Sequence, residues 1–246
     1  MRRIAAWLER FWESDKRMPV SDHVSNDDAA NAIAAVRAAH LTYCGKPKLE
    51  NLAAAALRVV REEVPGDFIE AGVALGGSAI VLARLKGARR LDLYDVFGMI
   101  PPPSDRDGED AHRRYAEIAS GQSRGIADDM YYGYVSDLKS HVEQNLAQFG
   151  IDLARNQVFL LPGLFEATLR PERPIALAHI DCDWYDSVKI CIERVTHLLS
   201  VGGMMAFDDY SSYSGCRRAV DEWLAENSQM EIVCQDRSIV VRKSRR

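Results

Sequence analysis

The sequence predicts an α/β protein whose mainly parallel sheet is covered by helices on both faces. From about residue 66, short apolar runs alternate with amphipathic segments of helical length, and this alternation is typical of parallel strands joined by crossover helices. Two further observations support it. A glycine-rich loop follows the first apolar run directly, and acidic residues stand where the later apolar runs end. Those are the two places where open α/β sheets carry their ligands.

The expected elements divide the chain into two regions. Residues 1–62 are rich in alanine, have apolar residues at helical spacing, and predict a helical region. Residues 63–246 predict the α/β domain. Its expected parallel strands are 68–73, 91–96, 158–161, 175–180 and 204–207, and its expected helices are 78–85, 138–149, 187–199 and 216–226. Residues 231–234 and 239–241 predict a terminal antiparallel hairpin that brings the sheet to seven strands.

Residues 98–137 interrupt the alternation. The segment contains three consecutive prolines, several glycines and aspartates, and the tyrosines Tyr131, Tyr132 and Tyr134. A polar insertion of this length in a compact domain is usually a functional lid or a disordered segment. We expect a lid whose tyrosines either contact a bound ligand or only close the site.

Composition limits the classes of protein. The chain has 246 residues, 47% of them apolar, with a net charge of −5. This suits a sizeable core and argues against a nucleic-acid partner. The five cysteines are scattered without metal-site spacing, which predicts free thiols in a reducing compartment and hence a cytoplasmic protein. No apolar stretch approaches the roughly 18 residues of a membrane span.

The N-terminus carries apolar residues at helical spacing: Ile4, Trp7, Leu8, Phe11 and Trp12. Charged residues interrupt them, so the segment does not resemble a secretory signal. An amphipathic helix is expected there. Packing on the domain or on a second subunit is favoured over contact with a membrane surface, and we therefore expect a homo-oligomer, most simply a dimer.

The loop after the first expected strand is a candidate cofactor site. It runs from Glu70 through Gly72 and Gly76 to Ser78, and its glycines allow close approach of a ligand and a tight helix start. Its spacing differs from G-x-G-x-x-G, which cradles a pyrophosphate. Glu70 disfavours phosphate and suits a cationic ligand that carries a sulfonium and an α-amino group. A plain glycine turn is the alternative.

Two later strand ends complete this candidate site. Asp95 ends the second expected strand, where an acid accepts hydrogen bonds from ribose hydroxyls in nucleoside-binding folds. Pro162 and Gly163 end the third strand and can line an apolar slot for an adenine ring, although the neighbouring Leu164 and Phe165 equally suit a core. Together these features favour S-adenosylmethionine over NAD.

Two acidic clusters follow the fourth and fifth expected strands. Asp181 and Asp183 come after the run 175–180, and Asp208 and Asp209 after the run 204–207. If both runs are parallel strands of one sheet, three or four carboxylates converge at its carboxyl edge. Carboxylates held close together repel one another, so a hard divalent cation is expected there. The alternatives are solvated acids at loop starts and, for Asp183, an N-cap of the next helix.

These motifs, in this order, resemble the macrocin O-methyltransferase family, which includes macrolide-sugar and aminocoumarin-sugar methyltransferases. The matching pieces are Glu70-x-Gly72 with Gly76-Gly77, Asp95, Leu161-Pro162-Gly163, Asp181-x-Asp183-x-Tyr185-x-Ser187, Gly202-Gly203, Asp208-Asp209-Tyr210 and the helix from Gly215 to Asp221. The resemblance covers roughly residues 42–226. It implies a Rossmann-like class I methyltransferase fold and Mg²⁺-dependent methylation of sugar hydroxyls by S-adenosylmethionine, with Asp181, Asp208 and Asp209 as metal ligands.

The sequence also departs from the family. Ala74-Leu75 stand where many macrolide-sugar members carry Trp-Arg, and the lid looks more like that of members encoded with polysaccharide pathways, including those that methylate mannose units of mycobacterial polysaccharides. The expected acceptor is therefore a small molecule or an oligosaccharide. A catechol-type phenolic O-methyltransferase and a non-catalytic nucleoside-binding module remain alternatives.

The expected catalytic base is Asp181, which can take the proton as it leaves the acceptor hydroxyl. His179 lies inside an apolar strand and is expected to be a satisfied core histidine. His141 lies on an amphipathic helix after the lid, where a surface role is expected.

Overall fold

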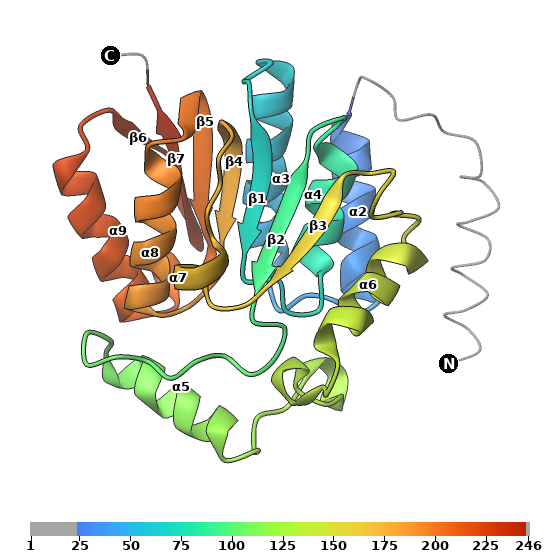
Figure 1. Ribbon diagram of the computed structural model, residues 1–246, viewed down its shortest axis with the longest axis vertical. Helices are drawn as coiled ribbons and strands as arrows, with labels where there is room; N and C mark the ends of the chain where they lie inside the picture. The colour runs from blue at the N-terminus through green and yellow to red at the C-terminus, as the bar shows by residue number, and fades with distance from the viewer. Residues whose placement is uncertain (1–23, 245–246) are drawn as a thin grey trace.

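The computed structural model describes residues 24–244 and has three layers, with one sheet between two layers of helices (Figure 1). The strands are ordered β3-β2-β1-β4-β5-β7-β6. β1 to β5 are parallel, and β7 pairs antiparallel with both β5 and β6. This confirms the predicted seven-stranded sheet with its terminal hairpin. The strands are β1 Asp67–Ala71, β2 Leu91–Asp95, β3 Val158–Pro162, β4 Ile175–Ile180, β5 Leu199–Phe207, β6 Met230–Asp236 and β7 Ser238–Lys243.

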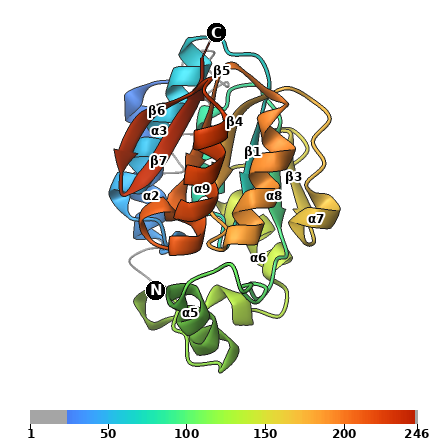
Figure 2. The ribbon, with the colours of Figure 1, turned by 90° about the vertical axis from the view of Figure 1, so that its left-hand side faces the viewer.

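Helices cover both faces of the sheet, as Figures 1 and 2 show. One core cluster lies under α2 (Asn26–Ala38), α3 (Lys46–Arg61), α4 (Gly77–Leu85) and α6 (Leu138–Gln148). The other lies under α8 (Tyr185–Thr196) and α9 (Ser214–Glu226), beside the short α7 (Phe165–Thr168). Every residue of β1, β2 and β4 is buried, as expected of parallel strands covered on both sides.

The predicted helical region at the N-terminus is part of the same core as the sheet. α2 begins with a capping box between Ser25 and Asp28, and apolar residues of α2 and α3 join the first core cluster. The helix expected around residues 4–12 lies outside the described residues. No helix within 24–244 has both the length and the apolar character that crossing a membrane requires.

The largest boundary difference from the prediction lies between α8 and β5. The expected helix end at Leu199 was wrong, because α8 ends at Thr196 and β5 already begins at Leu199. Gly202 and Gly203, which precede the expected strand 204–207, lie inside β5, where the pairing with β4 shifts register. Gly202 has φ +85°, a conformation suited to a strand irregularity at glycine.

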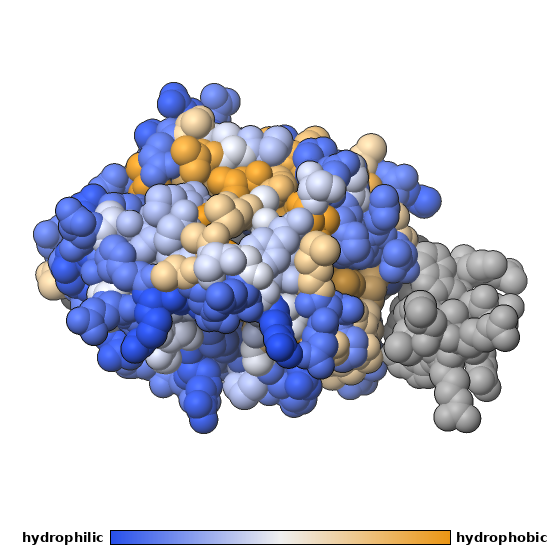
Figure 3. Space-filling view, turned by 90° about the horizontal axis from the view of Figure 1, so that it is seen from below, coloured by the Kyte–Doolittle hydropathy of each residue, from blue (hydrophilic) through white to orange (hydrophobic). Residues whose placement is uncertain are grey.

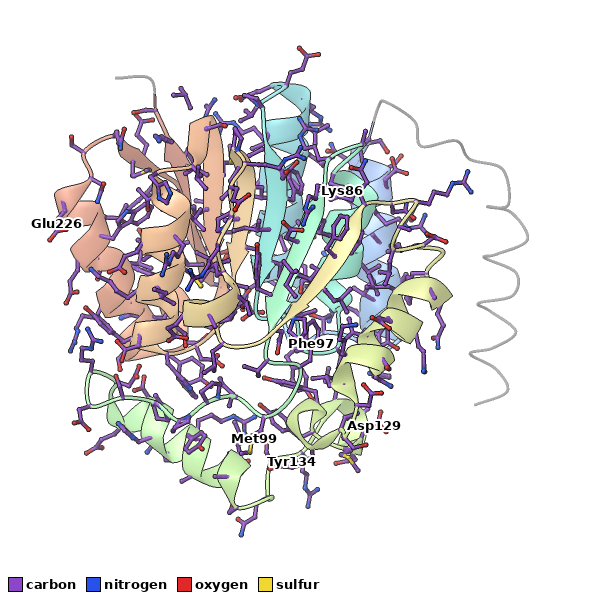
Figure 4. All side chains as sticks on the ribbon, in the orientation of Figure 1. Lys86, Phe97, Met99, Asp129, Tyr134 and Glu226 are labelled. Atoms are coloured by element: carbon purple, nitrogen blue, oxygen red, sulfur yellow. The ribbon has the colours of Figure 1, made fainter. Side chains whose placement is uncertain are left out.

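The segment expected to be a lid lies below the carboxyl ends of the parallel strands (Figure 1). It has structure of its own, namely α5 (Glu109–Ala119) and the 3₁₀ turns η1 (Ile126–Asp128) and η2 (Tyr132–Tyr134). Figure 4 shows Phe97 where the chain leaves the sheet, with Met99 and Tyr134 farther down in this segment.

Hydrogen bonds fasten the lid to the start of α8 and α9. Trp184 Nε1 donates to the carbonyl of Pro101 at 2.8 Å. The carboxylate of Asp107 accepts from the backbone N–H of Tyr185 at 2.7 Å, and that of Asp110 accepts from the N–H of Ser214 at 2.7 Å. Both acids thus cap the first turns of α8 and α9. The lid therefore contacts the N-terminal ends of α8 and α9, the helices that follow the two acidic clusters.

Candidate active site

The glycine loop passes very close to the end of β4. Gly72 has φ +91°, and a Cβ at this position would stand 1.7 Å from the carbonyl oxygen of Asp181. Only glycine permits this approach. The N–H of Asp181 in turn donates to the carbonyl of Ala71 at 2.8 Å. Gly72 therefore brings the candidate cofactor loop and the first acidic cluster together.

Asp95 shapes the same loop from the end of β2. Its carboxylate accepts hydrogen bonds from the backbone N–H groups of Val73 at 2.7 Å, Ala74 at 3.2 Å and Phe97 at 2.7 Å. Burial raises its pKa, and these three donors oppose the rise. A carboxylate has about four acceptor positions, and these three bonds fill most of them.

The side chain of Glu70, on β1, is buried in the protein core. It is fully buried, and its Oε1 lies 2.8 Å from Nδ1 of His179, its neighbour across β1 and β4. Its Oε2 has no hydrogen-bond partner within residues 24–244. Burial lowers the pKa of His179, but the hydrogen bond and charge of Glu70 outweigh burial and raise it. The prediction of a satisfied core histidine is confirmed, and His141 is exposed as expected.

The other predicted cofactor residues surround the loop without lining the cavity. Gly76, with φ +88°, caps α4, and Ser78 is buried in the first turn of that helix. Pro162 and Gly163 end β3, and the N–H of Gly163 donates to the carbonyl of Asp95 at 2.9 Å. These four residues support the two that line the cavity, Gly72 and Asp95.

A cavity of about 270 Å³ joins the glycine loop to the acidic clusters. Figure 3 views the molecule from the lid side, where the surface is largely hydrophilic with an apolar band across it. The walls of the cavity come from the loop before α3, the glycine loop, the lid and both acidic clusters. The lining residues are Tyr43, Cys44, Lys48, Gly72, Ala74, Asp95, Arg114, Ile118, Tyr131, Tyr132, Asp181, Asp183, Asp208, Asp209, Ser212 and Tyr213.

The acidic clusters converge in this cavity as the strand pattern predicts. Burial, followed by the charges of Asp208 and Asp209, raises the pKa of Asp181 well above its usual range. The same causes raise the pKa of Asp183 well above its usual range. Burial and Asp208 also raise the pKa of Asp209. These carboxylates lie in an environment that disfavours their charged forms.

The interpretation of Asp183 as a helix N-cap was wrong. The N-cap of α8 is Trp184, without a side-chain hydrogen bond, and Asp107 from the lid accepts from the first N–H instead. The backbone of Asp183 has φ +58°, and its N–H donates to Asp209 Oδ2 at 3.2 Å. The side chain therefore belongs to the acidic cluster.

Among the cavity residues that sequence reasoning missed, Lys48 and Cys44 lie nearest the acids. Lys48 Nζ, from α3, lies 2.6 Å from Asp208 Oδ2 and 3.9 Å from Asp209 Oδ1. Burial lowers the pKa of Lys48, but these two carboxylates outweigh burial and raise it. Cys44 Sγ lies 3.4 Å from Asp181 Oδ2. Both residues lie in the predicted helical region 1–62, and no sequence motif around them predicts a role in the site.

The donor set suits a divalent cation. Ligand atoms of Cys44, Asp181 and Asp208 all lie within 4.8 Å of one another. The single charge of Lys48 leaves the pKa of three neighbouring acids raised, whereas a divalent ion bound by carboxylate oxygens would stabilise their charged forms. Asp181 and Asp208 belong to this group of possible ligands, and the expectation that Asp209 joins them stays a prediction.

Aromatic side chains close the cavity on the lid side. Tyr43, from the loop before α3, has its ring centre 5.6 Å from that of Tyr132 and 6.2 Å from that of Tyr131. The rings of Tyr131 and Tyr132 are 4.5 Å apart, and burial raises the pKa of Tyr131 to about 12. The lid tyrosines thus contact the N-terminal helical region across the site.

The sheet order, the glycine loop after β1 and the acid after β2 define a class I methyltransferase. The family model described as Macrocin-O-methyltransferase matches residues 5–234, and the chain belongs to this family. It is an S-adenosylmethionine-dependent O-methyltransferase. The predicted family, fold and enzyme class are confirmed.

Several known proteins are similar to this chain. A 4'-O-methyltransferase from Streptomyces olivaceus, acting on 8-demethyl-8-(2,3-dimethoxy-alpha-L-rhamnosyl)-tetracenomycin C, is 32% identical over 74% of this chain and 67% of its own. The mycinamicin III 3''-O-methyltransferase of Micromonospora griseorubida is 30% identical over 74% and 69%. The structure of the O-methyltransferase NovP matches with a TM-score of 0.69 and 27% identity over 83% of each chain.

Proposed function

We propose that the protein transfers the methyl group of S-adenosylmethionine to a hydroxyl of a sugar, using a bound divalent cation. The observation that carries the proposal is the single cavity that joins the glycine loop to the acidic cluster. Such a cavity holds donor and acceptor side by side, which removes much of the entropic barrier to transfer. The names of the Streptomyces olivaceus and Micromonospora griseorubida relatives support an acceptor of the glycoside type.

The cofactor site is built on β1 and β2. Gly72 and Asp95 contact S-adenosylmethionine in this proposal, and Gly76, Ser78, Pro162 and Gly163 shape the space around it. Glu70 lies buried behind the loop and bonds His179, so in this proposal it supports the loop rather than contacting the cationic donor.

The acidic half of the cavity activates the acceptor. Asp181, Asp208 and Asp209 hold the divalent cation, for which the family resemblance implies Mg²⁺. A bound divalent cation lowers the pKa of a hydroxyl that contacts it. Asp181 is the proposed proton acceptor, because it lines the cavity beside the position proposed for the cation.

The acceptor enters from the lid side. Tyr43, Tyr131 and Tyr213 present aromatic surface to the cavity, and Arg114 adds hydrogen-bond donors. This lining suits a sugar, which has both apolar faces and hydroxyl edges. We propose a small-molecule or oligosaccharide acceptor, a dimeric enzyme and a cytoplasmic location, the last because all five cysteines are free thiols.

A screen of acceptors tests the proposal. Purified enzyme with labelled S-adenosylmethionine is given glycosides, oligosaccharides and catechols, each with EDTA and then with added Mg²⁺. Labelling of sugars that stops in EDTA and returns with Mg²⁺ is expected. If only catechols were labelled, the acceptor would be a phenol and not a sugar. If turnover were unchanged in EDTA, the reaction would not need a cation.

A further inference from the structure

We propose that an apolar groove between α2 and α3 is the docking site of residues 4–12 of the same chain. The groove is a cavity of about 280 Å³ lined by these two helices, and none of its lining residues lines the candidate active site. Residues 4–12 lie outside the described residues, and their sequence predicts an amphipathic helix. The proposal joins a surface that residues 24–244 leave open to a segment whose apolar side chains need cover.

The groove is apolar along most of its length. Ile33 and Leu57 lie at its base and are 4% and 5% exposed. Ala30, Ala34 and Ala54 also line it and are exposed. A surface helix usually presents charged or polar residues to solvent, and an apolar surface of this kind is typical of a contact site. Because alanine side chains are short, the groove has room for large side chains of another helix.

The N-terminal segment supplies large side chains in a matching arrangement. Its apolar residues recur at intervals of three and four, so they form one face of the predicted helix, and charged residues fall on the opposite face. The apolar face consists of Ile4, Trp7, Leu8, Phe11 and Trp12, and the charged face of Arg3, Glu9, Arg10 and Glu13. Burial of the apolar face in the groove removes both surfaces from water, which is favourable.

The length of the chain permits this contact. Arg61 donates to Asn26 Oδ1 at 2.8 Å, so the end of α3 lies beside the start of α2 and the groove follows both helices. Between Asn26 and Arg37 the groove is about 17 Å long, and a helix of residues 4–12 would be about 12 Å long. Residues 13–25 connect the segment to α2 and can extend to roughly 40 Å. The segment can therefore reach every part of its own groove.

The connection to α2 favours the segment of the same chain over that of a second copy. A short linker gives the segment an effective concentration on the order of millimolar at its own groove, and a second copy would have to approach that concentration to compete. Arg37, Lys46 and Glu50 line the groove with both signs of charge, as does the charged face of the segment, so repulsion between like charges does not oppose docking.

Hydrogen exchange of the full-length protein tests the inference. Amides of residues 4–12 should exchange at least about tenfold more slowly in the wild type than in Ala34→Glu or Ala54→Glu, because each variant puts a charge into the apolar groove. Ala225→Glu is the matched control, since Ala225 is an exposed alanine of α9, in the other helical layer. It should keep the slow exchange. Circular dichroism should show that all three variants fold, because the substituted side chains are exposed.

A photo-cross-linker identifies the chain that fills the groove. Phe11→benzoylphenylalanine is prepared in isotopically light and heavy forms, which are mixed before irradiation. Cross-links to residues 26–57 are expected within light chains and within heavy chains. Cross-links that join a light chain to a heavy chain instead would show that a second copy supplies the segment, and the proposal would be wrong.

Two results of the exchange experiment would also overturn the proposal. If residues 4–12 exchanged at the same rate in the wild type and in both groove variants, the segment would not occupy the groove. If their exchange became slow only after addition of vesicles of anionic phospholipid, the segment would bind a membrane surface and not α2 and α3.

Discussion

Asp95 and Asp181 stand at the carboxyl ends of β2 and β4, and they differ in the groups that surround their carboxylates. Asp95, at the end of β2, receives three backbone hydrogen bonds, which oppose the rise that burial causes in its pKa. Asp181, after β4, faces a thiol and other carboxylates, and its pKa is raised well above the usual range. The carboxylate of Asp95 is thus satisfied by the fold itself, whereas the acids after β4 and β5 share the single positive charge of Lys48 and favour a further positive partner. Each prediction below tests this difference, beginning with the largest expected effect.

Gly72 is the point where the two halves meet, and Gly72→Ala should have the largest effect. The new Cβ would overlap the carbonyl of Asp181, so both halves must move apart. We expect the free energy of unfolding to fall by at least about 3 kcal/mol, measured by urea denaturation. Gly121→Ala is the matched control, because Gly121 has φ +75° and nothing within 4 Å of the added atom. Gly121→Ala should cost only about 1 kcal/mol of stability, from backbone strain alone. If both variants lost the same free energy of unfolding, the close approach of Gly72 to the Asp181 carbonyl would be contradicted.

Replacing an acid of the metal half should remove activity without removing the cofactor. Asp181→Asn, Asp208→Asn and Asp209→Asn should each lower turnover by on the order of a hundredfold or more, about 3 kcal/mol in the barrier. Calorimetric affinity for S-adenosylmethionine should stay within about twofold. Stability should be unchanged or higher in Asp181→Asn, because one of several crowded acids is removed. Asp208→Asn also weakens the contact with Lys48 and should be less stable than Asp181→Asn.

The exposed Asp27 on α2 provides the control for these three variants. Asp27→Asn changes the net charge equally and should leave turnover unaffected. If any of the three acid variants turned over at the wild-type rate, that acid would be excluded from the site.

Asp95→Ala should show the reverse pattern. S-adenosylmethionine affinity should fall by about 1.5–3 kcal/mol, the range for losing hydrogen bonds to a charged group. Stability should fall as well, because Val73, Ala74 and Phe97 lose the acceptor of their N–H groups. Mg²⁺ binding should be retained. Unchanged cofactor affinity in calorimetry would place the ribose contact elsewhere.

The metal-free protein should lose stability as pH rises above the usual range of aspartate. Since the pKa of Asp181 is raised in the folded state, the folded protein binds more protons than the unfolded chain from about pH 4 up to that raised pKa. Stability is then present at low pH and falls through this window, by up to ~1.4 kcal/mol per pH unit for each proton. Urea denaturation in EDTA between pH 5 and 8 should show a flatter slope for Asp181→Asn than for the wild type. Identical slopes would mean that Asp181 is ionised in the folded protein.

The smallest effect is expected at the lid. Asp110→Ala removes the acceptor of the Ser214 N–H and should cost about 1 kcal/mol, as for other N-caps. Hydrogen exchange in residues 98–137 should become faster in this variant, and in the wild type it should become slower when cofactor and acceptor are both bound. The exposed Asp105 serves as control in Asp105→Ala. If hydrogen exchange in residues 98–137 were the same in Asp110→Ala as in the wild type, and the same with and without ligands, the segment would not close over the site.

Sequence by itself determined the features that depend on neighbours along the chain. Apolar runs fixed the strands, because burial on both faces requires continuous apolar residues. Strand ends then located Asp95, Asp181, Asp208 and Asp209, since parallel strands present their carboxyl ends at one edge.

Only the tertiary structure decided which groups meet these acids. Cys44 contacts Asp181 across 137 positions and Lys48 contacts Asp208 across 160, distances at which no periodicity persists. The capping of α8 by Asp107 and the pairing of Glu70 with His179 are equally non-local. Such contacts arise when helices and the lid dock on the sheet, and docking depends on the shape of whole surfaces.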